Sequence, residues 1–250
     1  MSLVRSERRG AVALITLDRP GANAFHAELV QELRGHLRQT RGAGAVVLTS
    51  ALPGFFSAGW DLPALARFSR KEMSSFYKAY CDLVREIFGL EAPVVAALPG
   101  HAIAGGLIVA AAADERYAAE GRGEFGLSEV RLGVPVPRCC FEIFRYAIGG
   151  HAAERLASSG ENLSAAEVLR IGLVDAIGPA EDLLERAVER ATRLAAVSAP
   201  AHAAIKSNAR AGALASYDSA RKTDSFLDLW FGEDAQQRIR ALVERLNKKT

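Results

Sequence analysis

Two short glycine segments and one glutamate are the residues whose types and spacing could carry out chemistry. "FFSAGWDL" spans residues 55–62 and "IAGGL" spans residues 103–107, and each joins a predicted strand to a predicted helix. A backbone N–H at such a junction has no intrahelical acceptor and lies at the positive end of the helix dipole. Two such groups that converge would form an oxyanion hole, because glycine lets a carbonyl approach closely. Taken singly, either segment could equally serve tight packing.

The glutamate is Glu129, within "FGLSEVRLG". Apolar surroundings should raise its pKa, which suits a base that removes a proton from carbon. The alternative is a carboxylate at a helix end or on the surface. The segment "GHAIAGG" lacks the Lys-Ser/Thr ending of a phosphate-binding loop, so we expect no nucleotide phosphate there.

The elements that must position these residues alternate along the first half of the chain. Apolar patterning predicts strands over residues 11–20, 45–50, 93–98 and 115–120, with helices over 26–41, 73–90 and 105–113. Residues 51–65 are expected to form a loop that leads into a helix capped by Asp61, and Pro99–Gly100 a turn. This alternation predicts an α/β fold. After residue 139 the pattern is mainly helical, with a capping box at Ser164 and Glu167 and a short strand near 173–177.

Composition excludes several classes of protein. The 250 residues are 50% hydrophobic, and 31 basic against 29 acidic residues give a net charge of +2, which argues against a nucleic-acid partner. The long apolar stretch 93–113 is interrupted by Pro93, Pro99 and Gly100, so we predict no membrane span. The apolar residues near the N-terminus alternate and reach Asp18 too soon for a signal peptide, so none is expected. Cys81, Cys139 and Cys140 suggest reduced, partly buried thiols rather than a disulfide framework, in a cytoplasmic protein. No metal site is predicted.

Three motifs in register carry a resemblance to a known family. "FFSAGWDL", "PVVAALPGHAIAGGLIVAAAAD" and "FGLSEVRLGV" resemble the enoyl-CoA hydratase/isomerase (crotonase) family in order and spacing, over Val12 to Ile177. The resemblance implies a spiral of ββα units over residues 1–195 and a helical oligomerisation region over 196–250. It also implies an acyl-CoA thioester substrate, no separate cofactor, and a homotrimer or a dimer of trimers.

The resemblance also assigns roles to individual positions. The oxyanion donors correspond to the N–H groups of Trp60 and Gly105. Coenzyme A is expected to lie against a set of small residues, mainly through main-chain groups: Ser57, Ala58, Gly59 and Gly106. The expected acyl pocket consists of Leu62, Leu65, Phe68, Leu107, Ile108 and Val134, although ordinary core packing explains these apolar residues equally well.

One departure from the family pattern directs the functional prediction. Hydratases of the family carry two glutamates that hold and activate a water; the first position is Ile108 here, while the second is retained as Glu129. Hydration needs a base on the water as well as a proton donor, so hydration should be poor. Moving a double bond from position 3 to position 2 needs only one carboxylate and an enolate-stabilising site. The chain therefore resembles the Δ3,Δ2-enoyl-CoA isomerase branch, with a hydratase or other lyase or hydrolase as the second interpretation and a non-catalytic acyl-CoA-binding subunit as the third.

Several other polar residues have weaker claims. His101 and His151 are expected to be structural, and Glu120 or Glu124 could replace the missing glutamate. Lys206 and Arg210 could contact the phosphates of coenzyme A, but a solvated helix face is the expectation we favour.

Overall fold

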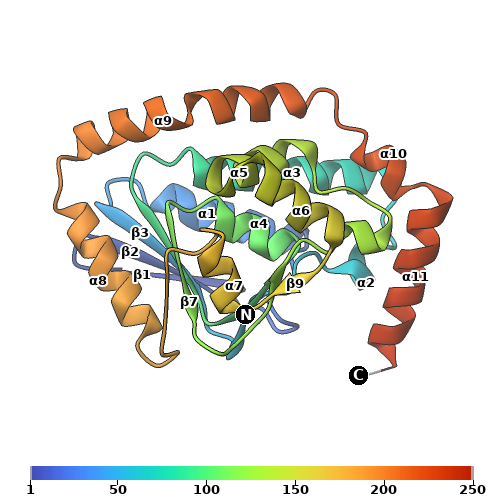
Figure 1. The fold of residues 1–250 in the computed structure, drawn as a ribbon, viewed down its shortest axis with the longest axis horizontal. Coiled ribbons are helices and arrows are strands. Elements are labelled where there is room, and N and C mark those ends of the chain that lie inside the picture. The colour runs from blue at the N-terminus through green and yellow to red at the C-terminus, as the bar shows by residue number, and fades with distance from the viewer. Residues whose placement is uncertain (1, 249–250) are drawn as a thin grey trace.

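The fold is built around a six-stranded sheet, seen in a computed structural model that describes residues 2–248 (Figure 1). The strand order is β1-β2-β3-β5-β7-β10; β1 and β2 pair antiparallel, and the pairs from β2 to β10 are parallel. Its strands are β1 (Val4–Arg9), β2 (Val12–Leu17), β3 (Ala45–Ser50), β5 (Val94–Leu98), β7 (Glu115–Ala119) and β10 (Ala176–Gly178). The mixed α/β architecture matches the predicted fold class.

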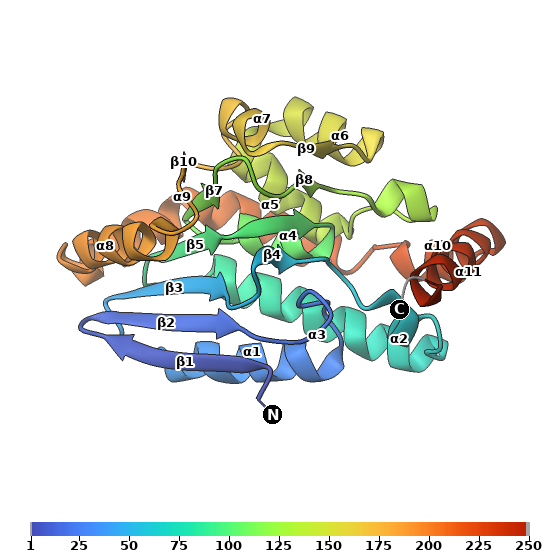
Figure 2. The same cartoon turned by 90° about the horizontal axis from the view of Figure 1, so that it is seen from below.

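Alternating side chains give this sheet two buried faces. Along β2, Ala13, Ile15 and Leu17 point into the main core, while Val12 and Leu14 point the other way. That second face is covered by α8 (Leu183–Ala195), which lies on one side of the sheet in Figure 2. The period of two in a strand places successive residues on opposite faces, so an apolar run is what a sheet covered on both faces requires.

A smaller four-stranded sheet carries the two glycine segments. Its order is β4-β6-β8-β9, with strands β4 (Gly54–Ser57), β6 (Gly100–Ile103), β8 (Phe125–Gly126) and β9 (Asn162–Leu163). Two expectations are corrected here, because residues 51–65 contain β4 rather than only a loop, and Gly100 begins β6 rather than completing a turn. Parallel pairing of β4 with β6 explains both, since short strands of four residues show little periodicity to detect.

The helices that the apolar spacing predicts are present, and they pack on the main core. Predicted helices correspond to α1 (Ala27–Gln39), α3 (Arg70–Phe88) and α4 (Gly105–Ala111), and Asp61 caps the short α2 (Leu62–Leu65). The capping box at Ser164 and Glu167 is confirmed at the start of α7. The second half adds α5 (Arg138–Ile148), α6 (Gly150–Ser159) and α7 (Ala165–Arg170), after the short 3-10 helix η1 (Glu129–Leu132).

The last three helices wrap around the molecule and end beside η1. The long α9 (Ala199–Ala220) packs on α5 and crosses the molecule, as Figure 1 shows, and leads to α10 (Phe226–Trp230) and α11 (Glu233–Asn247). Within this chain, α10 packs on α3, and α11 packs on η1 and α2. Among residues 2–248, no helix combines the length and apolar character that crossing a membrane requires.

Candidate active site

The first glycine segment leaves a free backbone N–H at Trp60. Phe25 pairs with this segment: its N–H donates to the Gly59 carbonyl (2.7 Å), and its carbonyl accepts from the Asp61 N–H (2.9 Å). In this parallel bridge the Trp60 N–H points away from Phe25 and has no acceptor within the described residues. Asp61 then begins α2 by accepting from the Ala64 N–H. The local pairing thus holds the donor of residue 60 in place without using it.

The second glycine segment places a free N–H at the first residue of α4. Ala104 precedes this helix with φ 48° and ψ −124°, a backbone conformation that a residue with a Cβ atom rarely adopts. Its N–H is fixed by the carbonyl of Gly126 (2.7 Å), and its own carbonyl accepts from Ile108. Gly105 follows as the first helical residue, so its N–H has no acceptor in the described chain and lies at the positive end of the helix.

These two segments lie against each other so closely that glycine is needed at both. A Cβ atom on Gly59 would lie 2.8 Å from the Ile103 carbonyl oxygen and 3.3 Å from the Gly105 nitrogen. A Cβ atom on Gly105 would lie 2.6 Å from Cδ1 of the Trp60 indole. The Tyr80 hydroxyl donates to the Gly105 carbonyl (2.5 Å) and so fixes the first residue of α4. Two segments more than 40 residues apart in the sequence, each with one free backbone N–H group, therefore lie in direct contact.

Glu129 begins η1 and is a buried carboxyl. Its exposure is 8%, and its Oε2 atom is buried with no hydrogen-bond partner within the described residues. Burial disfavours the charged form and raises the pKa of Glu129 to about 7, and this rise is only partly offset by the hydrogen bond from its own backbone N–H. A carboxyl group with a pKa near neutrality can both accept and return a proton.

One cavity of about 960 Å³ brings the glutamate and the two donor segments together. Of the residues predicted from sequence, those on its wall are Ala58, Trp60, Leu62, Gly105, Glu129 and Val134. A volume of this size accommodates an extended organic ligand. The arrangement suits proton transfer at a carbon next to a carbonyl whose oxygen the N–H groups could bind.

The other seven predicted site residues are not among those that line the cavity. Ser57, Gly59 and Gly106 are buried where β4 meets α4. Leu65, Leu107 and Ile108 are fully buried in the main core, and Phe68 is half-buried against it. None of the seven is among the residues that line the cavity in the described chain, so their predicted roles stay predictions.

The C-terminal helices supply a wall that sequence reasoning missed. Phe226 and Trp230 of α10 line the cavity. The Trp60 ring lies between aromatic rings at centroid distances of 5.1 Å (Phe76 and Tyr80) and 5.4 Å (Phe226). The aromatic and aliphatic residues of "FLDLW" (226–230) were the available signal, but their distance in sequence from the glycine segments concealed it.

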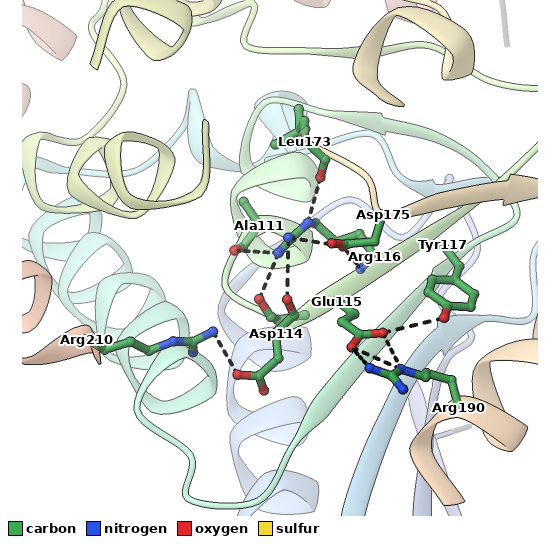
Figure 3. A network of polar contacts seen from close by, with 10 residues as sticks. Ala111, Asp114, Glu115, Arg116, Tyr117, Leu173, Asp175, Arg190 and Arg210 are labelled. Carbon is green, nitrogen blue, oxygen red and sulfur yellow. Dashed lines mark hydrogen bonds and ion pairs between the residues drawn. The ribbon is translucent and has the colours of Figure 1, made fainter. Parts of the chain in front are cut away.

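The expectation that Lys206 and Arg210 occupy a solvated face is wrong, and they do not line the cavity. Both are buried, and Lys206 Nζ and a guanidinium nitrogen of Arg210 bind the carboxylate of Asp114 at 2.6 and 2.8 Å. Figure 3 shows Arg210 reaching Asp114 beside the buried Arg116, whose side chain donates to carbonyl groups including that of Leu173. The cations hold α9 to the end of α4 because the burial of charge requires opposite charge nearby.

The remaining polar candidates lie outside the cavity. His101 accepts from the Glu124 N–H (3.1 Å) and packs near the Phe55 ring, while His151 is exposed. Glu120 and Glu124 are exposed, and the Glu124 carboxylate accepts from the Asn162 side chain (2.7 Å). Neither glutamate lines the cavity, so the structure lends no support to either as a replacement for the missing carboxylate. The three cysteines are free, as expected, and they are fully rather than partly buried.

The cavity thus combines a strand-to-helix turn with an unusual backbone conformation, two free backbone N–H groups and one buried carboxyl. The family model described as enoyl-CoA hydratase/isomerase matches residues 7–248. The chain belongs to this family and is an acyl-CoA enzyme of the crotonase type.

Individual relatives share the family but differ in the activity that they are named for. The human mitochondrial enoyl-CoA delta isomerase 1 is 28% identical, over 99% of this chain and 84% of its own length. A short-chain enoyl-CoA hydratase from Clostridium acetobutylicum is 29% identical (96% and 94%), and a carnitinyl-CoA dehydratase from Salmonella typhi is 33% identical (82% and 78%). The crystal structure of human mitochondrial delta3-delta2-enoyl-CoA isomerase superimposes with a TM-score of 0.94 at 28% identity, over 100% of both chains.

Proposed function

We propose that this protein is an enoyl-CoA isomerase that shifts a double bond from position 3 to position 2 of an acyl-CoA thioester. The observation that carries the proposal is that the cavity holds one buried carboxyl, Glu129. The other carboxylate among the described cavity residues is Asp234, whose side chain is 67% exposed and ion-paired with Arg238. One buried base beside two backbone donors is sufficient for a proton shift, whereas hydration requires a second group to activate water.

In the proposed reaction Glu129 acts first as a base and then as an acid. Its carboxylate removes a proton from C2, and the electron pair moves into the thioester to give an enolate. The N–H groups of Trp60 and Gly105 stabilise the enolate oxygen. The protonated Glu129 then returns the proton to C4, and the double bond comes to lie between C2 and C3.

Magnitudes support this division of roles. One oxyanion donor contributes about 2.7–4 kcal/mol, and a positioned base contributes about 10²–10⁴ in rate. Ile108 places an apolar side chain, 1% exposed, at the position where hydratases of the family carry a glutamate. This position therefore offers no carboxylate to hold a water.

A hydratase or dehydratase activity is the second candidate, because relatives with those names are as similar to this chain as the isomerase is. The test is a parallel assay of purified protein on 3-hexenoyl-CoA and 2-hexenoyl-CoA, with conjugation and hydration followed separately. Conjugation without hydration supports the isomerase. Hydration as the main activity would establish the second candidate, and binding without turnover of either substrate would indicate an acyl-CoA-binding subunit.

Variants at two positions sharpen the assay. Glu129→Gln should lower kcat for isomerisation by about 10²–10⁴, whereas the exposed Glu120→Gln serves as the matched control and should change it little. Ile108→Glu should raise hydration if a second carboxylate is what the site lacks. Full isomerase turnover by Glu129→Gln would exclude Glu129 as the acid/base.

We also propose that the chain assembles as a homotrimer or a dimer of trimers, with residues 196–250 as the oligomerisation region, on the basis of the family resemblance. The division falls between α8 and α9. Light scattering on the purified protein gives the assembly mass directly. A monomer at micromolar concentration would overturn this assignment.

A further inference from the structure

Three thiols from two helices meet in the core, outside the cavity. Cys81 lies in α3, and Cys139 and Cys140 lie in the first turn of α5. The Cys139 Sγ atom is 3.5 Å from Cys81 Sγ and 3.9 Å from Cys140 Sγ, and all three sulfurs lie within 4.8 Å of one another. All three residues are 0% exposed, and none lines the cavity that contains Glu129.

The spacing of these sulfurs fits a single three-coordinate ion. With a metal–thiolate bond of about 2.3 Å, a trigonal ion holds its three sulfurs about 4.0 Å apart. The two separations of 3.5 and 3.9 Å are within half an ångström of that value, and the third is at most 4.8 Å. Side-chain adjustments of less than an ångström would therefore suffice.

We propose that Cys81, Cys139 and Cys140 form a three-thiolate site for a soft monovalent ion of the copper(I) class. Thiolate sulfur selects soft ions such as Cu(I) over the hard cations that prefer oxygen. Structural zinc takes four ligands. The Tyr217 hydroxyl is 3.8 Å from Cys140 Sγ, but it already donates to the Cys81 carbonyl (2.6 Å). The donor set therefore favours an ion that is satisfied by three sulfurs.

Binding involves no change in oxidation state. Three thiols lose their three protons to solvent and one monovalent ion binds the three thiolates, which gives the site a net charge of −2. Because the site joins α3 to α5, an occupied site should stabilise the packed arrangement of these helices by linkage.

The test is an anaerobic titration of the reduced, full-length protein with Cu(I), in competition with a chromophoric Cu(I) chelator of known affinity. We expect one Cu(I) per chain and an X-ray absorption spectrum with three sulfur neighbours at about 2.3 Å. The sequence contains no other cysteine, so thiol binding can only come from this cluster. Two outcomes would overturn the proposal. One is a spectrum with two sulfur neighbours, and the other is that the protein binds no Cu(I) when the chelator holds the free Cu(I) concentration at a micromolar level.

Variants locate the ion within the cluster. Cys81→Ser should lower the affinity by at least the roughly 10–100-fold that loss of an outer-shell partner costs, and should reduce the sulfur count to two. Tyr217→Phe keeps all three thiols and is the matched control, which should still bind one Cu(I) through three sulfurs. Equal affinity in Cys81→Ser and wild type would sink the three-thiolate assignment. The wild-type spectrum decides the proposal even if a variant fails to fold.

Discussion

Two partly or fully buried carboxylates lie near opposite ends of α4, and they have opposite surroundings. Asp114 follows the helix and accepts from Lys206, Arg210 and the Val94 N–H, at 2.6–2.8 Å. Glu129 shares the cavity wall with Gly105 at the start of the helix, and its Oε2 atom has no partner within the described residues. Both side chains are largely removed from water.

The difference shows how partners decide what a buried charge does. The Asp114 carboxylate binds two cations and one backbone amide, and so it contributes to the packing of α9 on the core. Removing this carboxylate leaves the two buried cations without opposite charge. A carboxyl without such partners has a raised pKa and is available for proton transfer.

The largest expected effect is on stability at the paired site. Asp114→Asn should lower the free energy of unfolding by about 3–5 kcal/mol, because Lys206 and Arg210 would remain buried without opposite charge. Chemical denaturation measures this. The control is Asp228→Asn, which removes an exposed ion pair with Arg70 and should cost less than about 1 kcal/mol. Equal effects of the two substitutions would contradict the comparison.

The unpaired site should respond in the opposite direction. With a folded pKa of about 7 against 4.5 for the free side chain, Glu129 binds a proton more tightly in the folded protein. Stability is therefore lost as the pH rises from 4.5 to 7. Glu129→Gln should recover up to about 3 kcal/mol at pH 8, and almost nothing at pH 4. Thermal melts at the two pH values check this, and a loss of stability at pH 8 would show that Glu129 has a partner in solution.

Isomerisation should follow the same ionisation. The base must be charged to remove a proton, so kcat/KM should rise with pH and level off above about 7. At pH 5 it should be about a hundredfold below the plateau. A rate profile on 3-hexenoyl-CoA from pH 5 to 9 measures this, and a midpoint near 4.5 would mean that burial does not shift the pKa of Glu129 in solution.

The smallest effect is expected behind the backbone donors. Tyr80→Phe removes the hydroxyl that holds the Gly105 carbonyl, and should cost about 1 kcal/mol of stability and lower kcat several-fold. Tyr77→Phe, one turn away on α3, removes a hydroxyl that donates to Asp224, and should cost similar stability with kcat unchanged. If kcat falls equally in both variants, Tyr80 has no specific role in positioning Gly105.

Much of the local structure could be predicted because it depends on neighbours in the sequence. The apolar run 45–50 forms a strand, and Ser164 and Glu167 cap a helix, through interactions within a few residues. The free N–H group of Gly105 also follows from a local junction between a strand and a helix, whereas that of Trp60 depends on the bridge to the distant Phe25. The strand β4 escaped prediction because its pairing partner is β6, more than 40 residues along the chain.

The sequence by itself determined the family, the α/β alternation and the two glycine segments. It also showed that one of the two glutamates of the family's hydratases is retained as Glu129, while the position of the other is Ile108. Only the tertiary structure decided that Phe226 and Trp230 line the cavity, that Ile108 is fully buried, and that Lys206 and Arg210 bind Asp114. The reason is physical: local patterning depends on adjacent residues, whereas burial and charge pairing depend on which distant surfaces come together. Whether an ionisable side chain is solvated, ion-paired or buried without a partner depends on the folded structure.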